Sequence, residues 1–399
     1  MPVFDDLQIY DARERWAVGL ADAGLRLLTA PATLWRAPRP HQPPRRVLVL
    51  RLERIGDLLM TFGALASLRA RLPHAEIDLC VASWNEPLAR AMAVADRVDV
   101  LDPPWLAREQ PGTPWARLRA HARGWRRNRY DLAINLEPDI RSNLLLWWSG
   151  AVRRVGYFTG GGGALLTDEA AYNPALHTHD NAMRLVGLAV PDRADAPPVR
   201  PRLQLPGAAR ERARDLLAPA AGAVCVGIHA SGGRPVKQWH AGRFAEVAAA
   251  LGREYGATIA LTGAPADAAL VRQVEAGIPA GVRVLNLCGR ADVIDLAAVI
   301  ERLALFVTGD TGPMHLAAAV GAPVVALFGP SVPARYAPRS AGSRVVRVDL
   351  PCSPCNRIRL PPARCRGRVP DCLDGISVDA VLAAARGLLE SGRTILGEE

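Results

Sequence analysis

The chain has 399 residues, 50% of them hydrophobic, a mean hydropathy of +0.07 and a net charge of +10. This length allows two domains with separate cores, and the hydrophobic content excludes a disordered chain. The positive charge favours anionic partners such as phosphorylated substrates or an anionic membrane surface. It is spread along the sequence without a long basic block, so we expect no nucleic-acid partner.

Residues 1–44 form an N-terminal appendage that ends in a proline-rich connector. Tryptophans and leucines alternate with arginines over residues 1–37, which predicts an amphipathic segment. It would either lie peripherally on the inner face of an anionic inner membrane or pack as a helix on its own domain. There is no secretory signal and no apolar run of about 18 residues, and seven cysteines suit a reducing compartment, so we expect a cytoplasmic protein.

A first alternation of strands and helices covers residues 45–192. Continuous apolar runs predict buried parallel strands at 46–52, 77–81, 98–101 and 132–136. Leucines at helical spacing after Asp57 predict a helix there, and a second helix is expected over Asn181–Leu188.

A linker at 193–222 separates this domain from a second alternation at 223–399. Strands are expected at 224–228, 258–262, 284–287, 303–307 and 324–328, and helices at 242–255, 267–276, 292–302 and 313–320. The pattern predicts an α/β protein with two Rossmann-like, doubly wound domains facing across a cleft.

The turn at Asp310, Thr311 and Gly312 lies between a buried strand and a helix that has Pro313 in its first turn. Such a turn directs unpaired N–H groups and the positive end of the helix dipole at one point, which suits a phosphate. Asp310 would then accept hydrogen bonds from neighbouring sugar hydroxyls. Alternatively, Asp310 or Thr311 only caps the helix.

Lys237 is the single lysine among 49 basic residues. It follows the predicted strand 224–228 and the loop 229–233 and precedes an amphipathic helix. Lysine offers a compact point charge where arginine offers a planar fork, so this position is a second candidate ligand contact. Alternatively, it is a chance survivor on a solvated loop.

Three segments in this order resemble the lipopolysaccharide heptosyltransferase family: 51–61 (RLERIGDLLMT), 229–239 (HASGGRPVKQW) and 310–330 (DTGPMHLAAAVGAPVVALFGP). The resemblance covers residues 46–385. It implies the two-domain GT-B fold and an inverting glycosyltransferase that moves heptose, with ADP-heptose as donor and a lipopolysaccharide-core or similar lipid-linked glycan as acceptor.

The resemblance also implies roles for individual residues. Asp57 would be the catalytic base that deprotonates the acceptor hydroxyl, whereas its local sequence taken alone favours the N-cap of the following helix. Lys237 would steady the diphosphate leaving group. The remaining donor-binding candidates are Ser231, Gly232, Asp267, Asp310, Thr311, Gly312 and His315.

Two of these donor candidates carry alternatives. Asp267 could accept the ribose hydroxyls or cap a helix, and His315 could contact the ligand or be a structural histidine. The lysine and the helix amides would stabilise the negative charge of the leaving group, so we expect that the chemistry needs no divalent cation. The acceptor candidates are Arg54, Gly56 and Arg141, with Arg153 and Arg154 as further cations for an anionic acceptor.

Cys352, Cys355, Cys365 and Cys372 form a four-thiolate pattern within proline-rich loops. In a reducing compartment this favours tetrahedral zinc or iron as a structural clip. Some members of the resembled family carry such a cluster, and a cysteine-bound iron is known among relatives that act on autotransporters. The alternatives are reduced thiols or a regulated disulfide.

Two rival functions fit the same sequence. A sugar-nucleotide epimerase would convert the donor without an acceptor, and a non-catalytic protein would bind a nucleotide sugar without turnover. The interpretation as a transferase depends on a cleft shared by Asp57 and Lys237.

Overall fold

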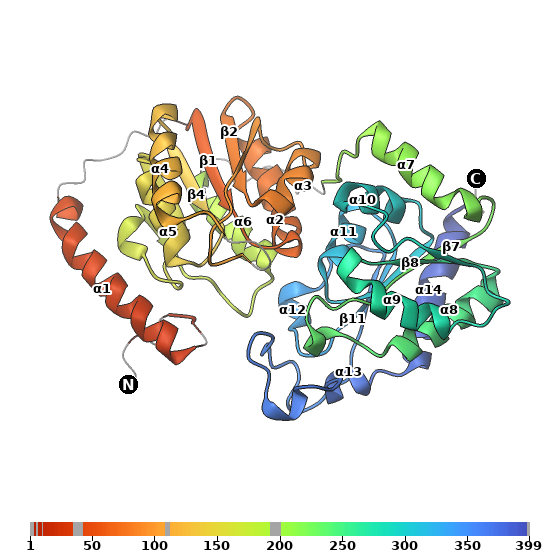
Figure 1. Ribbon diagram of the computed structural model, residues 1–399. Helices are drawn as coiled ribbons and strands as arrows, with labels where there is room; N and C mark the ends of the chain where they lie inside the picture. Colours follow the sequence, from red (N-terminus) through yellow and green to blue (C-terminus); the bar gives the residue numbers. More distant parts are fainter. Residues whose placement is uncertain are drawn as a thin grey trace. The chain divides into compact units, whose positions relative to one another are not determined.

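The computed structural model describes residues 4, 7–9, 11–34, 43–107, 112–191 and 201–396. The chain folds into two compact units, Met1–Pro201 and Arg202–Glu399, each built around one six-stranded parallel sheet (Figure 1). This confirms the predicted fold class of α/β protein with two Rossmann-like domains. No helix in the described ranges is long and apolar enough to cross a membrane.

The first unit has the strand order β3-β2-β1-β4-β5-β6. Its strands are β1 (Arg46–Arg51), β2 (Glu76–Val81), β3 (Arg97–Val100), β4 (Leu132–Asn135), β5 (Arg153–Tyr157) and β6 (Asp168–Ala170). Its helices are α1 (Ala12–Leu34), α2 (Ile55–Arg71), α3 (Glu86–Ala91), α4 (Trp115–Gly124), α5 (Ile140–Trp148) and α6 (Thr178–Ala189).

The second unit repeats this topology with the order β12-β11-β10-β7-β8-β9. Its strands are β7 (Cys225–His229), β8 (Thr258–Thr262), β9 (Val284–Asn286), β10 (Leu305–Gly309), β11 (Val324–Leu327) and β12 (Ser343–Val346). Its helices are α7 (Gly207–Leu217), α8 (Ala241–Tyr255), α9 (Ala268–Ala276), α10 (Val293–Glu301), α11 (Gly312–Val320), α12 (Pro333–Tyr336), α13 (Asp371–Asp374) and α14 (Val378–Leu396).

Apolar strands become central strands because helices bury both faces of each sheet. Every residue of β7, β8, β10 and β11 is buried, as are five of the six residues of β1. A parallel sheet covered on both faces needs such continuous apolar runs. Polar side chains at these strands are therefore confined to the strand ends, which is where a ligand site can form.

The order of strands reverses at β1 in the first unit and at β7 in the second. β1 has β2 on one side and β4 on the other, and β7 lies between β8 and β10. The loops that follow the two strands on either side of such a point diverge and leave a crevice at the carboxyl edge, where ligands of doubly wound sheets bind. Each unit thus has one edge at which a site is expected.

Candidate active site

The donor-binding candidates lie at one edge of the second sheet. Ser231, Gly232 and Lys237 follow β7, Asp267 follows β8, and the group from Asp310 to His315 follows β10. Because β10, β7 and β8 are parallel neighbours, their carboxyl ends share an edge. The structure therefore gathers all eight candidates around the reversal point at β7.

Lys237 and Asp310 form an ion pair at this edge. The Nζ atom of Lys237 lies 2.8 Å from an Oδ atom of Asp310, and the two side chains are only 19% and 11% exposed. The pair holds the Lys237 amine at the strand ends instead of leaving it extended into solvent. A solvated-loop origin for Lys237 is therefore wrong, because the lysine is anchored beside β10.

Gly232 allows the loop before Lys237 to fold back on itself. A Cβ atom at Gly232 would lie 2.7 Å from the carbonyl carbon of Lys237 and 2.8 Å from its oxygen. Contacts that short do not occur, so only glycine fits without moving the backbone that carries the lysine. The position of Lys237 thus depends on Gly232.

The start of α11 carries no side-chain cap. Thr311 occupies the N-cap position but makes no hydrogen bond to the helix, and its hydroxyl lies 3.1 Å from that of Thr308. Pro313 follows in the first turn, and Asp310 is engaged by Lys237. The prediction that Asp310 or Thr311 only caps this helix is therefore wrong, and the helix presents backbone N–H groups of the kind that bind phosphate.

Two further donor candidates lie at the same edge, one in a turn and one buried. Asp267 accepts a hydrogen bond at 2.9 Å from the Ala264 amide and so stabilises the turn after β8. His315 is buried, with 7% exposure.

His229 ends β7 beneath this edge and was not predicted as a site residue. Its Nδ1 atom lies 3.1 Å from the Thr262 hydroxyl, and burial lowers the pKa of His229 to about 4 despite the Asp267 carboxylate. The imidazole is therefore neutral at physiological pH. The positive charge at this edge comes from Lys237 and the start of α11.

Asp57 lies at the matching edge of the first unit, in the first turn of α2. Its carboxylate accepts a hydrogen bond at 3.3 Å from the Arg54 amide, and its side chain is 31% exposed. Arg54 is the N-cap residue, so the prediction that Asp57 could be the N-cap is wrong. Asp57 stands three residues further on, as the acidic partner of a capping box.

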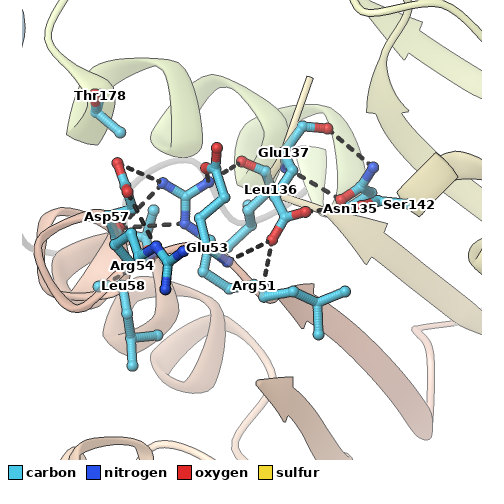
Figure 2. A network of polar contacts seen from close by, with 12 residues as sticks. Arg51, Glu53, Arg54, Asp57, Leu58, Asn135, Leu136, Glu137, Ser142 and Thr178 are labelled. Atoms are coloured by element: carbon cyan, nitrogen blue, oxygen red, sulfur yellow. Dashed lines mark hydrogen bonds and ion pairs between the residues drawn. The ribbon is translucent and has the colours of Figure 1, made fainter. Parts of the chain in front are cut away.

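Arg51 is buried beneath Asp57 and connects the two loops of this edge (Figure 2). It donates to the main-chain oxygens of Leu136 at 2.7 Å and of Asp57 at 3.1 and 3.2 Å. It also pairs with the carboxylates of Glu53 at 2.8 Å and of Asp57 at 3.8 Å. The first turn of α2 is thus fixed to the end of β4.

Glu137 holds the same loop from the other side (Figure 2). Its carboxylate is buried and accepts from the Leu52 amide, from the Glu53 amide at 3.0 Å and from the Ser142 hydroxyl at 2.7 Å. Burial raises the pKa of Glu137, and burial together with the neighbouring carboxylates raises that of Glu53 to about 8, against the opposing effect of Arg51. The loop of Asp57 therefore rests on the buried side chains of Arg51 and Glu137.

Arg51, Glu53 and Glu137 were not predicted from the sequence as parts of the candidate site. The available signal was a charged residue at the end of each apolar run: Arg51 is the last residue of β1, and Glu137 follows β4 by two residues. Charges at the carboxyl ends of neighbouring parallel strands meet at one edge, so the two could have been paired from the sequence.

The acceptor candidates Arg54 and Arg141 are both stacked on tryptophan. Arg54 lies 4.7 Å from the Trp84 ring and donates to the Leu106 carbonyl. Arg141 lies 5.0 Å from the Trp105 ring and bonds the Asp139 carboxylate. Both guanidinium groups are held at the carboxyl edge, together with Gly56 in the first turn of α2.

Arg153 and Arg154 begin β5 and so lie at its amino end, away from the edge that carries Asp57. Arg153 pairs with Asp168 at 3.6 Å and Arg154 donates to the Leu165 carbonyl at 2.7 Å. Arg141 follows the carboxyl end of β4, whereas Arg153 and Arg154 lie at the opposite, amino end of the neighbouring strand β5. The prediction that they assist Arg141 is therefore wrong.

The four cysteines of the C-terminal loops line one cavity of about 410 Å³, together with Arg357 and Arg364. All are free thiols, and burial raises the pKa of Cys372. Within the described residues no three histidine, cysteine or acidic side chains come close enough to hold a metal ion. The thiols share a cavity, but they do not form a coordination shell in this structure.

Two doubly wound units, each with charged side chains at its carboxyl edge, fit the class of two-domain glycosyltransferases. Residues 118–361 match the family Glycosyltransferase family 9 (heptosyltransferase). The chain belongs to this family and is a glycosyltransferase.

Similar proteins agree with this assignment. Lipooligosaccharide heptosyltransferase 2 of Haemophilus influenzae is 26% identical over 317 residues, which span 76% of this chain and 88% of the relative. The structure of a family 9 glycosyltransferase from Veillonella parvula has a TM-score of 0.75 and 25% identity, covering 87% of this chain and 98% of that one. The structure of ADP-heptose lipopolysaccharide heptosyltransferase II of Escherichia coli has a TM-score of 0.72 and 23% identity, covering 87% and 99%.

Proposed function

We propose that this glycosyltransferase transfers heptose from ADP-heptose to a lipid-linked glycan of the lipopolysaccharide-core type, with inversion at the anomeric carbon. The observation that carries the proposal is the Lys237–Asp310 pair beside the uncapped start of α11. In this combination, the lysine cation and several backbone amides can bind a diphosphate. The Asp310 carboxylate can accept hydrogen bonds from sugar hydroxyls. The similarity to an ADP-heptose-dependent enzyme of Escherichia coli supports this choice of donor.

In the proposed reaction Asp57 removes the proton from the acceptor hydroxyl as that oxygen attacks the anomeric carbon. The bond from this carbon to the diphosphate breaks on the opposite face of the sugar. Lys237 and the amides of Thr311 and Gly312 stabilise the charge that develops on ADP. These groups supply the stabilisation that a divalent cation gives elsewhere, so the chemistry needs no metal.

The other residues would bind and orient the two substrates. Ser231 and Gly232 would line the diphosphate pocket, Asp267 would accept the ribose hydroxyls, and His315 would support the α11 side of the pocket. Arg54 and Arg141, held on their tryptophans, would meet anionic groups of the acceptor. This reaction requires the edges that carry Asp57 and Lys237 to face one cleft.

A nucleotide-sugar panel tests the proposal. ADP-heptose should raise the Tm of the protein most, since a ligand that binds only the folded state stabilises it by mass action. ADP should be released only when a core-type acceptor is also present. Conversion of ADP-heptose without an acceptor would instead indicate an epimerase, and binding without turnover would indicate a non-catalytic protein. Either result would overturn the proposal.

We also propose that the cysteine cavity takes up a structural zinc or iron ion. Four thiols around one cavity support this, and they would have to come closer together to form the coordination shell. Metal analysis of the purified protein should find about one ion per chain. It should find no ion in a variant with Cys352 and Cys355 changed to serine. A wild-type protein that has the same Tm with and without its metal would contradict the proposal.

A further inference from the structure

The N-terminal helix α1 is seated on the first unit by one face only. Asp22, which is 8% exposed, accepts a hydrogen bond at 2.7 Å from the Gly162 amide and a second at 3.0 Å from Arg26. Just before the helix, Gln8 bonds the main-chain oxygens of Thr159 and Tyr172 at 2.8 and 2.6 Å. These contacts hold α1 at the ends of β5 and β6.

The glycine run 160–163 forms the seat of this helix. Gly161 has φ +87°, and a Cβ atom there would lie 2.5 Å from a methyl group of Val18 on α1. The run thus serves the contact with α1. Glycine at this position is required by both backbone conformation and close approach.

The seat lies beside the candidate acceptor residues. The glycine run also packs against Ile140, the first residue of α5, and the Glu14 carboxylate on α1 lies 4.0 Å from the Arg141 guanidinium. β4 and β5 are parallel neighbours, so α1 and Arg141 share the carboxyl edge of the first sheet. Whatever binds the outer face of α1 is brought next to the acceptor side of the site.

The outer face of α1 is an apolar stripe of Trp16, Leu20 and Leu27. These side chains are 49%, 63% and 79% exposed, so they are not part of the core formed by the described residues. At about 100° per residue they fall within about 40° of one another on the helix. Arg13 flanks the stripe on one side, and Arg15 and Arg26 flank it on the other.

We propose that this stripe docks α1 in the plane of an anionic phospholipid membrane. The exposed leucines and tryptophan would enter the boundary between headgroups and acyl chains, and the flanking arginines would contact lipid phosphates. α1 is seated at the acceptor edge, so docking carries Arg141 and the base loop to the surface that holds a lipid-linked acceptor. This last step rests on the proposed function, whereas the membrane contact does not.

Sedimentation with vesicles tests the membrane contact without an activity assay. The full chain should bind phosphatidylglycerol vesicles at least about tenfold more than phosphatidylcholine vesicles, because the arginines need anionic headgroups. A variant with Trp16, Leu20 and Leu27 changed to serine should lose about tenfold or more of that binding. Equal binding to the two kinds of vesicle, or full binding by the variant, would overturn the proposal.

A matched control carries the changes Val152→Ser, Val345→Ser and Leu360→Ser, at apolar residues that are 62%, 36% and 49% exposed elsewhere. It should bind vesicles as the wild type does and have the same Tm as the stripe variant. With a core glycolipid in vesicles as acceptor, the stripe variant should transfer sugar more slowly than the control. With a soluble acceptor fragment, the two variants should have the same transfer rate. A wild-type dimer that the stripe variant converts to a monomer would show that a second copy covers the stripe, contrary to the proposal.

Discussion

At the scale of single residues, the position of Lys237 makes it the leading candidate for a donor contact. Arginine fills the other 48 basic positions of the chain, yet this site is occupied by lysine. The Lys237 amine lies 2.8 Å from Asp310 in a setting where both side chains are largely buried. A planar guanidinium is larger and would not fit the same pair without moving the loop, which Gly232 holds tightly.

Lys237→Met should weaken ADP-heptose binding about tenfold to hundredfold, since it removes a charge-assisted contact to phosphate and leaves the Asp310 carboxylate uncompensated. Lys237→Arg should recover only part of the affinity, because the planar guanidinium group carries the positive charge in a different geometry from the lysine amine. Titration calorimetry of the three proteins measures this directly. Identical donor affinity in all three would remove Lys237 from the site.

His229 predicts a dependence of stability on pH. Burial lowers its pKa to about 4, so the unfolded chain takes up a proton at higher pH than the folded chain does. The free energy of unfolding is therefore full above the unfolded pKa of about 6.5 and falls as the pH drops towards 4. Between pH 7 and pH 5 we expect a loss of about 2 kcal/mol.

His229→Gln separates this effect from the carboxylates that titrate at lower pH. We compare the free energies of unfolding of the wild type and the variant, measured with urea at several pH values. The difference between them should shrink by about 2 kcal/mol between pH 7 and pH 5. A difference that stays constant over this range would mean that His229 takes up its proton at the same pH in the folded and the unfolded protein.

At the scale of elements, nine of the twelve strands in the described residues could be predicted from the sequence, including the edge strands β3 and β9. β1, β7, β8 and β11 are buried apolar runs, and their predicted bounds agree with the structure to within a residue or two. The predicted strand 303–307 begins two residues too early, since β10 spans Leu305–Gly309. The correct end places Asp310 directly after the strand.

Three strands, β5, β6 and β12, escaped sequence analysis. β6 and β12 are edge strands of three and four residues, and β5 opens with two arginines. Short or charged strands at the side of a sheet carry little apolar signal, because one side of them meets solvent. The candidate site was predicted where motif and strand end coincided, and missed where it depends on charges that approach from separate loops.

The loop between β1 and α2 depends on Glu137, and its removal gives an element-scale prediction. Glu137→Ala leaves the Leu52 and Glu53 amides without their acceptor and should lower the free energy of unfolding by about 3–5 kcal/mol. Glu86→Ala removes a glutamate from an exposed pair with Arg90 and should cost about 0.5 kcal/mol or less. Urea unfolding measures both, and equal losses would contradict a special role for Glu137.

Glu137→Gln addresses the possibility of a variant that does not fold. The amide keeps an oxygen for the loop amides but cannot balance the charge of Arg51. We expect a folded enzyme with reduced kcat and unchanged donor affinity, as a misplaced base loop requires. An unchanged kcat would make Glu137 a purely structural residue.

At the scale of the whole molecule, the two units divide the work that the proposal assigns. One sheet edge offers the Lys237–Asp310 pair and the start of α11 to the donor, and the other offers Asp57 on a loop fixed by buried charges. Both edges occur where the strand order reverses, so the same topology, used twice, provides two candidate sites with different side chains.

Asp57→Ala tests the central claim most directly, with transfer and donor binding measured on the same preparation. We predict that ADP release in the presence of acceptor falls about a thousandfold, since a general base contributes about that much, while the Kd for ADP-heptose stays within about twofold of the wild type. Full turnover by the variant, or loss of donor binding equal to the loss of transfer, would contradict the assignment of Asp57 as the base.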